Sequence, residues 1–461
     1  MSITVLGAGP GGYVAAIKAA QLGASVTVIE ESEVGGTCLN WGCIPTKALV
    51  ASADVLDKAK NVKDFGLELN GNISPNLQKI IERKNKIVNT QVKGIRGLLK
   101  SWGIRVLNGR GFIISSGKIR VTLKDGGLDE LETDKIIVAT GSSPAQIPVF
   151  PFDNEKIFSS NDALNLRNIP ESLLIIGAGV IGCEFAFIYK AFGSEITIVE
   201  MMPGAVSTED EEISGILERE LKKKKIKLIT NMKVEKIDVK KNSVLAFLSD
   251  GRTIETEKVL VSIGRSMNSE NIGLENIGVK TGQRAEIIVN NKMETNVDGV
   301  YAVGDVTGGI MLAHVASKEG MVAAENAIGG NSSINYAVVP SAIFTSPEIA
   351  SVGLREKEAL EKGYKVKIGR FQFRALGKVH AIGEIAGLVK IITDEQSGMI
   401  LGTHIIGPHA SELIHEAAIA IENGLTAKDI AHTIHAHPTL SEGLMEAAED
   451  VYNSAIHIPK K

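Results

Sequence analysis

The sequence predicts an α/β protein in which parallel strands alternate with helices, followed by a tail of mixed strands and helices. Residues 3–30 and 173–200 each read as an apolar strand, a glycine-rich turn, a helix and a second strand that ends in glutamate. The tail from about residue 339 has no glycine-rich turn of its own. The fold class we expect is therefore two Rossmann-like dinucleotide-binding domains plus an α+β C-terminal domain.

The first unit contains the turn GAGPGG between its first strand and its helix. Gly7 permits the tight turn, Gly9 lets the backbone approach a pyrophosphate, and Gly12 lets the helix pack on the strand. The helix N-terminus then receives the negative charge. Glu30, about twenty residues further on, is expected to bind ribose hydroxyls. This pattern predicts one bound dinucleotide.

The second unit repeats the pattern at nearly equal spacing, with Gly177, Gly179 and Gly182 in the turn and Glu200 as the acid. Two such units in one chain imply two nucleotides. A carboxylate at Glu200 would repel a 2′-phosphate, and no arginine follows in residues 201–204, so NAD is expected rather than NADP. The alternative reading, an acid that only ends a surface strand, stays open.

The segments around the two units indicate how they are connected. Residues 73–101 read as helix, 105–112 and 118–123 as short strands, and 136–141 as a buried strand that meets a tight turn. Prolines then follow at 144, 148 and 151, which favours a crossover into a second domain. Further strand-to-glycine patterns stand at 259–265 and 300–305.

Composition excludes several classes of partner. The 50 basic and 54 acidic residues leave a net charge of −4, which argues against a nucleic-acid or anionic-membrane surface. The most apolar stretch, 173–192, contains glycines and charged residues and so reads as strand, loop and helix rather than a membrane span. Because the N-terminus lacks a secretion signal, a cytoplasmic location is expected; an organelle-matrix or stromal protein without its transit peptide would look the same.

Two of the three cysteines, Cys38 and Cys43, lie in the run GGTCLNWGCIPTK shortly after the first unit. Only Cys183 remains, which excludes a disulfide framework, and a C-x4-C pair without a nearby histidine is a poor zinc site, so no metal is expected. Two close thiols beside a dinucleotide fold indicate a redox-active disulfide that works against a flavin. A helix beginning near Pro45 would lower the pKa of the inner sulfur. Two buried structural thiols are the alternative.

Four further side chains suit thiol chemistry. Lys47 stands four residues after Cys43 on the same helix face, and our hypothesis is that it forms an ion pair with Glu184 from the second unit. His437 precedes a proline, and Glu442 follows five residues later. An imidazole oriented by a carboxylate can take and return a proton near neutral pH. A histidine bonded only to loop backbone is the alternative.

Together these motifs resemble the flavin disulfide reductases, the class I pyridine nucleotide-disulfide oxidoreductases. The resemblance rests on GAGPGGY, GGTCLNWGCIPTK, GAGVIGCE, AVGDVTGGIMLAHVASKEG and HAHPTLSE, and it covers essentially the whole chain. It is nearest to the members that oxidise dihydrolipoyl groups with NAD. It implies an FAD-binding domain at 1–145, an NAD-binding domain at 146–268, a central domain completing the FAD site at 269–338, and an interface or dimerisation domain at 339–461.

The resemblance also implies a role for each motif residue. Cys38 would exchange with substrate and Cys43 would contact the flavin. His437 and Glu442 would act across a homodimer interface on the other subunit's disulfide. Residues implied to bind FAD are Gly7, Gly9, Gly12, Glu30, Thr37, Lys47, Gly111, Thr140, Gly141, Ser142, Asp305, Met311, Leu312, Ala313 and His314. Residues implied to bind NAD are Gly177, Gly179, Val180, Ile181, Gly182, Glu184, Glu200, Val234 and Gly264.

Several features discriminate among substrates. Mercuric reductases are expected to carry a C-terminal cysteine pair, whereas no cysteine follows Cys183 here, and Glu200 argues against the NADP-linked glutathione type. Trp41 stands where the family often has a smaller residue, which implies different packing near the disulfide.

We expect no lipoyl-type domain before Met1. The lipoyl group is therefore expected on a carrier protein of a 2-oxo-acid dehydrogenase complex or a glycine-cleavage system. Two rivals remain open. One is a reductase of glutathione, another small disulfide or a small protein; the other is a flavoprotein scaffold whose turnover is incidental.

Overall fold

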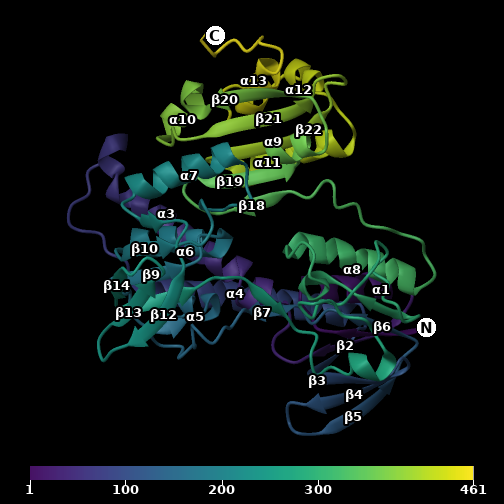
Figure 1. Cartoon of the computed structure of the whole chain (residues 1–461). Coiled ribbons are helices and arrows are strands. Elements are labelled where there is room, and N and C mark those ends of the chain that lie inside the picture. The colour runs from purple at the N-terminus through teal and green to yellow at the C-terminus, as the bar shows by residue number, and fades with distance from the viewer. Residues whose placement is uncertain (460–461) are drawn as a thin grey trace.

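The computed structural model describes residues 1–459, and Figure 1 shows their arrangement in three groups of sheets and helices. The first group is built on a seven-stranded sheet whose first five strands are parallel and whose last two form an antiparallel extension. Across the sheet the strands are β17 (Val300–Ala302), β6 (Lys135–Val138), β1 (Ser2–Leu6), β2 (Ser25–Glu30), β3 (Arg105–Ser115), β4 (Lys118–Leu123) and β5 (Leu128–Glu132).

The helices α1 (Pro10–Gln21) and α8 (Ala313–Ala327) lie side by side on this sheet. Small residues allow the close approach: a Cβ on Gly320 of α8 would lie 2.3 Å from the carbonyl oxygen of Gly11 in α1. Their apolar faces share one core with β1, β2 and β6. Because the chain returns to the first sheet with β17 and α8 after the second group, residues far apart in sequence build one layer.

The second group is built on a five-stranded parallel sheet around the second glycine turn. Its strands are, in order, β11 (Lys227–Ile229), β10 (Glu195–Val199), β9 (Ser172–Ile176), β15 (Lys258–Val261) and β8 (Ile157–Phe158). The associated helices are α5 (Ser160–Ala163), α6 (Val180–Phe192) and α7 (Glu211–Lys223). Two small sheets accompany it: β12 (Val234–Val239), β13 (Val244–Leu248) and β14 (Thr253–Thr256), and the pair β7 (Ser142–Pro144) and β16 (Arg265–Met267).

The third group, at the top of Figure 1, is an antiparallel five-stranded sheet that we call the C-terminal sheet. Its order is β18 (Ser341–Ile343), β19 (Glu348–Gly353), β22 (Ile400–Gly407), β21 (Leu388–Asp394) and β20 (Val366–Gln372). The helices around it are α9 (Glu356–Glu361), α10 (Gly377–Ile382), α11 (Ala410–Glu422), α12 (Ala427–His432) and α13 (Glu442–Asp450).

Three helices connect the first group to the others: α2 (Gly36–Asn40), α3 (Cys43–Lys60) and α4 (Leu77–Ser101). Helix α3 packs on α6, so the segment that follows the first unit rests on the helix of the second. Side chains of α3, α6 and α7 share a core with four residues of the C-terminal sheet: Ile343, Ile349, Leu388 and Ile406. The three groups therefore meet at α3. Short 3-10 helices lie at Val62–Phe65, Leu274–Ile277, Gly304–Thr307 and Phe373–Ala375.

Two helix starts differ from the prediction, and several strands, among them β5, β12, β13 and β14, were not predicted. Helix α4 begins at Leu77 rather than residue 73, because the side chain of Asn76 caps it by accepting the N–H of Lys79 at 3.1 Å. Helix α3 begins at Cys43, two residues before the predicted start. Strand β5 was not predicted, since its sequence LDELE is rich in acids that are unusual in strands. No helix within residues 1–459 is long and apolar enough to span a membrane.

Candidate functional site

A cavity of about 1440 Å³ lies where the three groups meet and collects most of the residues implied to bind the cofactors. Such a volume exceeds that of an ordinary small-molecule pocket. The predicted residues that line it are Gly7, Gly9, Glu30, Thr37, Cys38, Cys43, Lys47, Gly111, Thr140, Gly141, Ser142, Val180, Ile181, Glu184, Asp305, Met311, Leu312, Ala313 and His314.

Both glycine turns have the geometry that the sequence predicts. Gly7 and Gly177 adopt φ values of +98° and +102°, in the left-handed region that favours glycine. A Cβ on Gly12 or Gly182 would lie 2.0 Å from the carbonyl oxygen of the first glycine in its turn. At Gly179, by contrast, a Cβ would meet no atom within 4 Å. The middle of the turn thus leaves the open space that a pyrophosphate needs, and the residues fit a dinucleotide.

The acid at the end of each second strand is tied to its own glycine turn. Glu30 accepts the N–H of Ala8 at 2.7 Å, and Glu200 accepts that of Ala178 at 2.6 Å. The second oxygen of each accepts an N–H two residues on. Burial raises the pKa of Glu30. Each carboxylate is therefore held beside its turn, where ribose hydroxyls can donate to it.

The two thiols lie at a helix junction in the cavity. Cys38 is in α2 and Cys43 is the first residue of the 18-residue helix α3. Both cysteines are free, and the Cys38 thiol donates a hydrogen bond to the Cys43 sulfur. That bond lowers the pKa of Cys43 to about 7, against the effect of burial and with help from Lys47, and it raises the pKa of Cys38. The pKa of the inner sulfur is lowered, which is the predicted direction, but the largest cause is the hydrogen bond from Cys38 and not the helix start.

The predicted ion pair between Lys47 and Glu184 is present. The Lys47 ammonium lies 2.8 and 2.9 Å from the two carboxylate oxygens of Glu184, which is 4% exposed. The backbone N–H of Phe344 also donates to Glu184, at 2.9 Å, and its ring lies 4.3 Å from the Lys47 ammonium. The pair thus joins α3, α6 and the C-terminal sheet beside the thiols. The sequence analysis missed Phe344, which carries no motif signal.

Asp305 is held by two side chains from a neighbouring strand pair. It accepts a hydrogen bond from the Ser142 hydroxyl, and Arg265 lies 3.6 Å from its carboxylate. Arg265 also donates to the Ser142 hydroxyl at 2.6 Å and carbonyl at 2.7 Å. Sequence reasoning missed Arg265, although the strand-to-glycine pattern ending at Gly264 points to it.

His437 and Glu442 form the predicted pair, with His437 Nδ1 2.8 Å from Glu442 Oε1. The other oxygen of Glu442 accepts the N–H of Thr439 at 2.8 Å, which fixes the carboxylate. The His437 side chain is 76% exposed and lies outside the cavity. Its action on a second subunit's thiols stays a prediction.

The remaining predicted residues do not line the cavity. They are Gly12, Gly177, Gly179, Gly182, Glu200, Val234 and Gly264. Of these, Gly12 and Gly182 serve helix packing, and Gly177 and Glu200 shape the second turn. Val234 is buried at the start of β12. Within the described residues, no group of three or more His, Cys, Asp or Glu could hold a metal ion.

Two family models match the chain. Residues 1–320 match pyridine nucleotide-disulphide oxidoreductase, and residues 339–448 match the dimerisation domain of the same proteins. The second match supports the predicted homodimer. Taken together, the two matches cover the glycine turns, the cysteine pair and the histidine–glutamate pair.

Similar proteins agree over the full length. A Chlamydia muridarum protein named dihydrolipoyl dehydrogenase is 44% identical over 457 residues, which are 99% of this chain and 97% of that protein. The Bacillus subtilis protein of the same name is 43% identical over 469 residues, covering 99% and 98%. The crystal structure of LpdA from Mycobacterium tuberculosis has a TM-score of 0.92 at 31% identity, covering 97% and 99%.

A flavoprotein disulfide reductase from Escherichia coli, RclA, has a TM-score of 0.86 at 26% identity, covering 96% of this chain and 98% of that one. These matches confirm the predicted fold class and the predicted class of enzyme. The chain belongs to the pyridine nucleotide-disulphide oxidoreductase family.

Proposed function

We propose that the protein is a dihydrolipoyl dehydrogenase: it oxidises dihydrolipoyl groups and passes the electrons through its cysteine pair and FAD to NAD⁺. The Chlamydia muridarum and Bacillus subtilis relatives named for this activity are 44% and 43% identical over nearly the whole chain, whereas RclA is 26% identical. The observation that carries the proposal is the placement of Cys38 and Cys43 at a helix start in a cavity bordered by residues of both glycine turns.

The two nucleotides are assigned to different units. FAD would lie along Gly7, Gly9 and Glu30 with its ring toward the thiols, and NAD would lie along the turn after Gly177 with its ribose on Glu200. The domains follow from this assignment: an FAD-binding domain at 1–145, an NAD-binding domain at 146–268, a central domain at 269–338 and an interface domain at 339–461. The crowded third glycines support both sites, and so do the middle glycines: a Cβ at Gly179 would meet no atom within 4 Å, and one at Gly9 only the Cα of Gly36 at 3.8 Å.

The thiol step is a disulfide exchange. In the oxidised enzyme, one dihydrolipoyl sulfur attacks Cys38, which breaks the Cys38–Cys43 bond and forms a mixed disulfide. The second dihydrolipoyl sulfur then attacks the first, which releases cyclic lipoyl disulfide and leaves a dithiol on the enzyme. Two electrons and two protons move from substrate to the cysteine pair.

The environment of Cys43 stabilises its thiolate, the form that carries the two electrons toward FAD. The hydrogen bond from Cys38 and the charge of Lys47 stabilise negative charge on Cys43, so this sulfur is the leaving group of the exchange. Glu184 holds Lys47 in place. Bound FAD supplies the two-electron chemistry that links a thiolate to hydride transfer to NAD⁺.

The proton of the substrate thiol requires a base, and His437 of a second subunit is assigned this role. Glu442 accepts from His437 Nδ1, which leaves Nε2 free to take the proton. The exposure of His437 in one chain suits a side chain that completes a neighbour's site.

The substrate is assigned to a protein carrier. The lipoyl group would arrive on a carrier of a 2-oxo-acid dehydrogenase complex or a glycine-cleavage system. We place the enzyme in the cytoplasm, or in an organelle matrix or stroma, where such carriers act.

A Cys43→Ser variant tests the thiol relay. It should lose about 100-fold or more of dihydrolipoamide oxidation with NAD⁺, because serine cannot form the disulfide, while NADH-driven dye reduction persists. Cys183→Ser is the matched control and should keep both activities, since Cys183 is buried away from the cavity. Full dihydrolipoamide activity in Cys43→Ser would refute the relay. Faster turnover of glutathione disulfide with NADPH by the unmodified enzyme would favour the rival substrate.

A further inference from the structure

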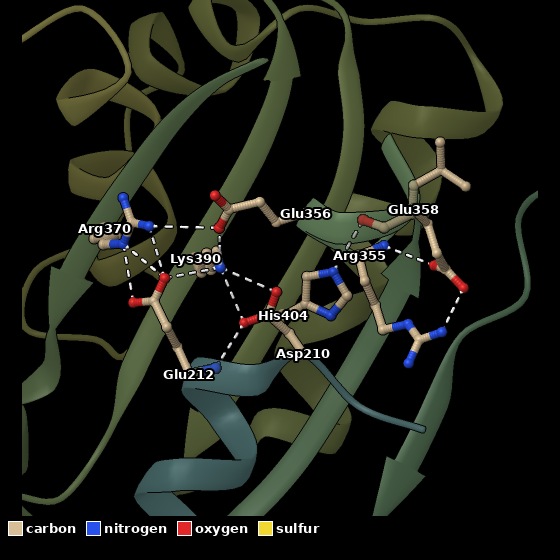
Figure 2. A network of polar contacts seen from close by, with 9 residues as sticks. Asp210, Glu212, Arg355, Glu356, Glu358, Arg370, Lys390 and His404 are labelled. Carbon is tan, nitrogen blue, oxygen red and sulfur yellow. Dashed lines mark hydrogen bonds and ion pairs between the residues drawn. The ribbon is translucent and has the colours of Figure 1, made fainter. Parts of the chain in front are cut away.

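A buried charge network lies where the second group meets the C-terminal sheet (Figure 2). Its centre is Lys390 on β21, which is only 1% exposed. The Lys390 ammonium lies 3.0 Å from both oxygens of Asp210, 2.8 Å from Glu212 and 2.7 Å from Glu356. One buried cation therefore contacts three carboxylates from two different groups of the fold.

Arg370 on β20 completes the network. Its Nε lies 2.9 and 3.0 Å from the two oxygens of Glu212, and one terminal nitrogen lies 2.6 Å from one of them. These bonds lower the pKa of Glu212 to about 2. Burial opposes the charge on Lys390, but its three carboxylate partners raise its pKa. The network thus holds two cations, Lys390 and Arg370, and three carboxylates, so it has a net charge of −1. Removing Lys390 would leave three carboxylates beside one cation.

The network fixes the start of α7. Asp210 is the N-cap of α7 and accepts the N–H of Glu212 at 3.0 Å, so Lys390 holds the capping carboxylate itself. Two side chains further along α7 form hydrogen bonds with the backbone of Ala205, in the loop that precedes the helix. Ser214 donates to the carbonyl of Ala205, and Glu218 accepts the N–H of Ala205 at 3.1 Å. A shift of α7 would therefore move this loop.

The loop in turn contacts the second glycine turn. The N–H of Val206 donates to the carbonyl of Ala178 at 2.8 Å. Val206 is buried and has a φ of +44°, which is strained for a β-branched residue and persists only when its surroundings impose it. Because Glu200 accepts the N–H of Ala178 while Val206 binds its carbonyl, the peptide groups of the turn are held from both sides.

We infer that Lys390, on the C-terminal sheet, is a positioning residue for the nucleotide site of the second unit. The contacts run from Lys390 through Asp210 and α7 to Ala205 and Val206, and from Val206 to Ala178. The inference rests on the proposed function, in which this turn binds NAD. Lys390 acts on NAD affinity and not on the exchange between substrate and the thiols, because the network does not line the cavity that holds the thiols.

The test uses the flavin-loaded enzyme with Lys390→Met and follows the two half-reactions separately. The dissociation constant for NADH, measured by fluorescence, should rise about tenfold. Flavin reduction by dihydrolipoamide without NAD should keep its rate, and Lys390→Arg should recover part of the affinity. Lys367→Met is the matched control, since Lys367 lies on β20 of the same sheet and its side chain forms an exposed ion pair with Glu395. It should bind NADH as the unmodified enzyme does.

Asp210→Asn keeps the test decisive if Lys390→Met does not fold, because asparagine still caps α7 but loses the charge that Lys390 binds. It should weaken NADH binding about threefold with the thiol half-reaction intact. Unchanged NADH affinity in a folded, flavin-loaded variant overturns the inference, and so does an equal slowing of both half-reactions. If the unmodified enzyme fails to bind NADH, the proposed function fails instead.

Discussion

The two βαβ units have nearly the same turn but differ in how the rest of the chain covers it. In the first, Gly11 is buried, and a Cβ there would lie 3.0 Å from Val303 and 3.2 Å from the carbonyl oxygen of Ala316 in α8. In the second, Ile181, which stands at the position of Gly11, is half-buried, Gly179 is exposed and Val180 is 39% exposed. The same local motif is therefore enclosed in one case and open in the other.

The features that bind a dinucleotide are therefore distinct from the features that keep it bound between turnovers. The glycines and the acid provide a dinucleotide site in either unit, because the backbone and one carboxylate make the contacts. The additional layer around the first turn comes from β17 and α8, which follow the second unit in sequence. An enclosed site suits a resident cofactor such as FAD, and an open site suits a nucleotide that must exchange in every turnover.

The largest expected effects come from replacing the third glycine of each unit with alanine, because the two variants should lose different nucleotides. Gly12→Ala places a Cβ 2.0 Å from the Gly7 carbonyl oxygen and should cost about 3 kcal/mol of stability and the bound flavin. Gly182→Ala makes the same clash with Gly177 but should keep the flavin and weaken NADH binding about 100-fold. Flavin absorbance, thermal unfolding and NADH titration measure the three effects. Equal flavin loss in both variants would show that the units are not separate sites.

Removing the charge of the second acid should have a smaller effect. Glu200→Gln should weaken NAD binding about tenfold and reduce the preference for NAD over NADP, because the carboxylate no longer accepts ribose hydroxyls or repels a 2′-phosphate. Steady-state KM values for both nucleotides provide the measurement. Glu30→Gln is the matched control; it should loosen the flavin and leave the NAD preference unchanged. A preference that stays the same in Glu200→Gln would contradict the assignment.

The smallest expected effect concerns Cys43, Lys47 and Glu184, where the two units meet. It is a shift in the pH at which the reduced enzyme loses its Cys43 thiolate. The pKa of Cys43 is lowered to about 7, so its thiolate is present above that pH and is lost as the pH falls through it. The long-wavelength thiolate–flavin absorbance should follow the same curve. Because Glu184 raises the pKa of Cys43, Glu184→Gln should move the midpoint to lower pH by about one unit or less. Lys47→Met should move it to higher pH, and a midpoint unchanged in both would contradict this electrostatic coupling.

The part of the site that could be predicted consists of short motifs. The turns at Gly7 and Gly177, the thiols at Cys38 and Cys43, and the pair of His437 and Glu442 each depend on residues close together in the chain, where spacing alone sets geometry. The ion pair of Lys47 with Glu184 was also predicted, as a hypothesis from the position of Lys47 on the same helix face as Cys43. The roles of these residues in catalysis remain proposals.

Residues without a motif could not be predicted. Arg265, Phe344 and Lys390 act through partners more than a hundred residues away. The strand-to-glycine pattern before Arg265 marks its position but not its partners, and the sequence neighbours of Phe344 and Lys390 give no sign of either. Lys390 in particular lies in a strand of apolar residues, where a lysine would ordinarily point to solvent. Its burial is stable because the packing of α7 against the C-terminal sheet brings Asp210 and Glu212 to it, while α9 supplies Glu356.

The amino-acid sequence by itself determined the two nucleotide turns, the redox pair and the alternation of strands and helices, because glycine conformation, hydrophobic period and thiol spacing act over a few residues. Tertiary structure alone decided which turn is enclosed and which is open, and how the C-terminal sheet reaches the second turn. The reason is physical: burial and charge compensation depend on atoms that the chain brings together only when distant segments pack.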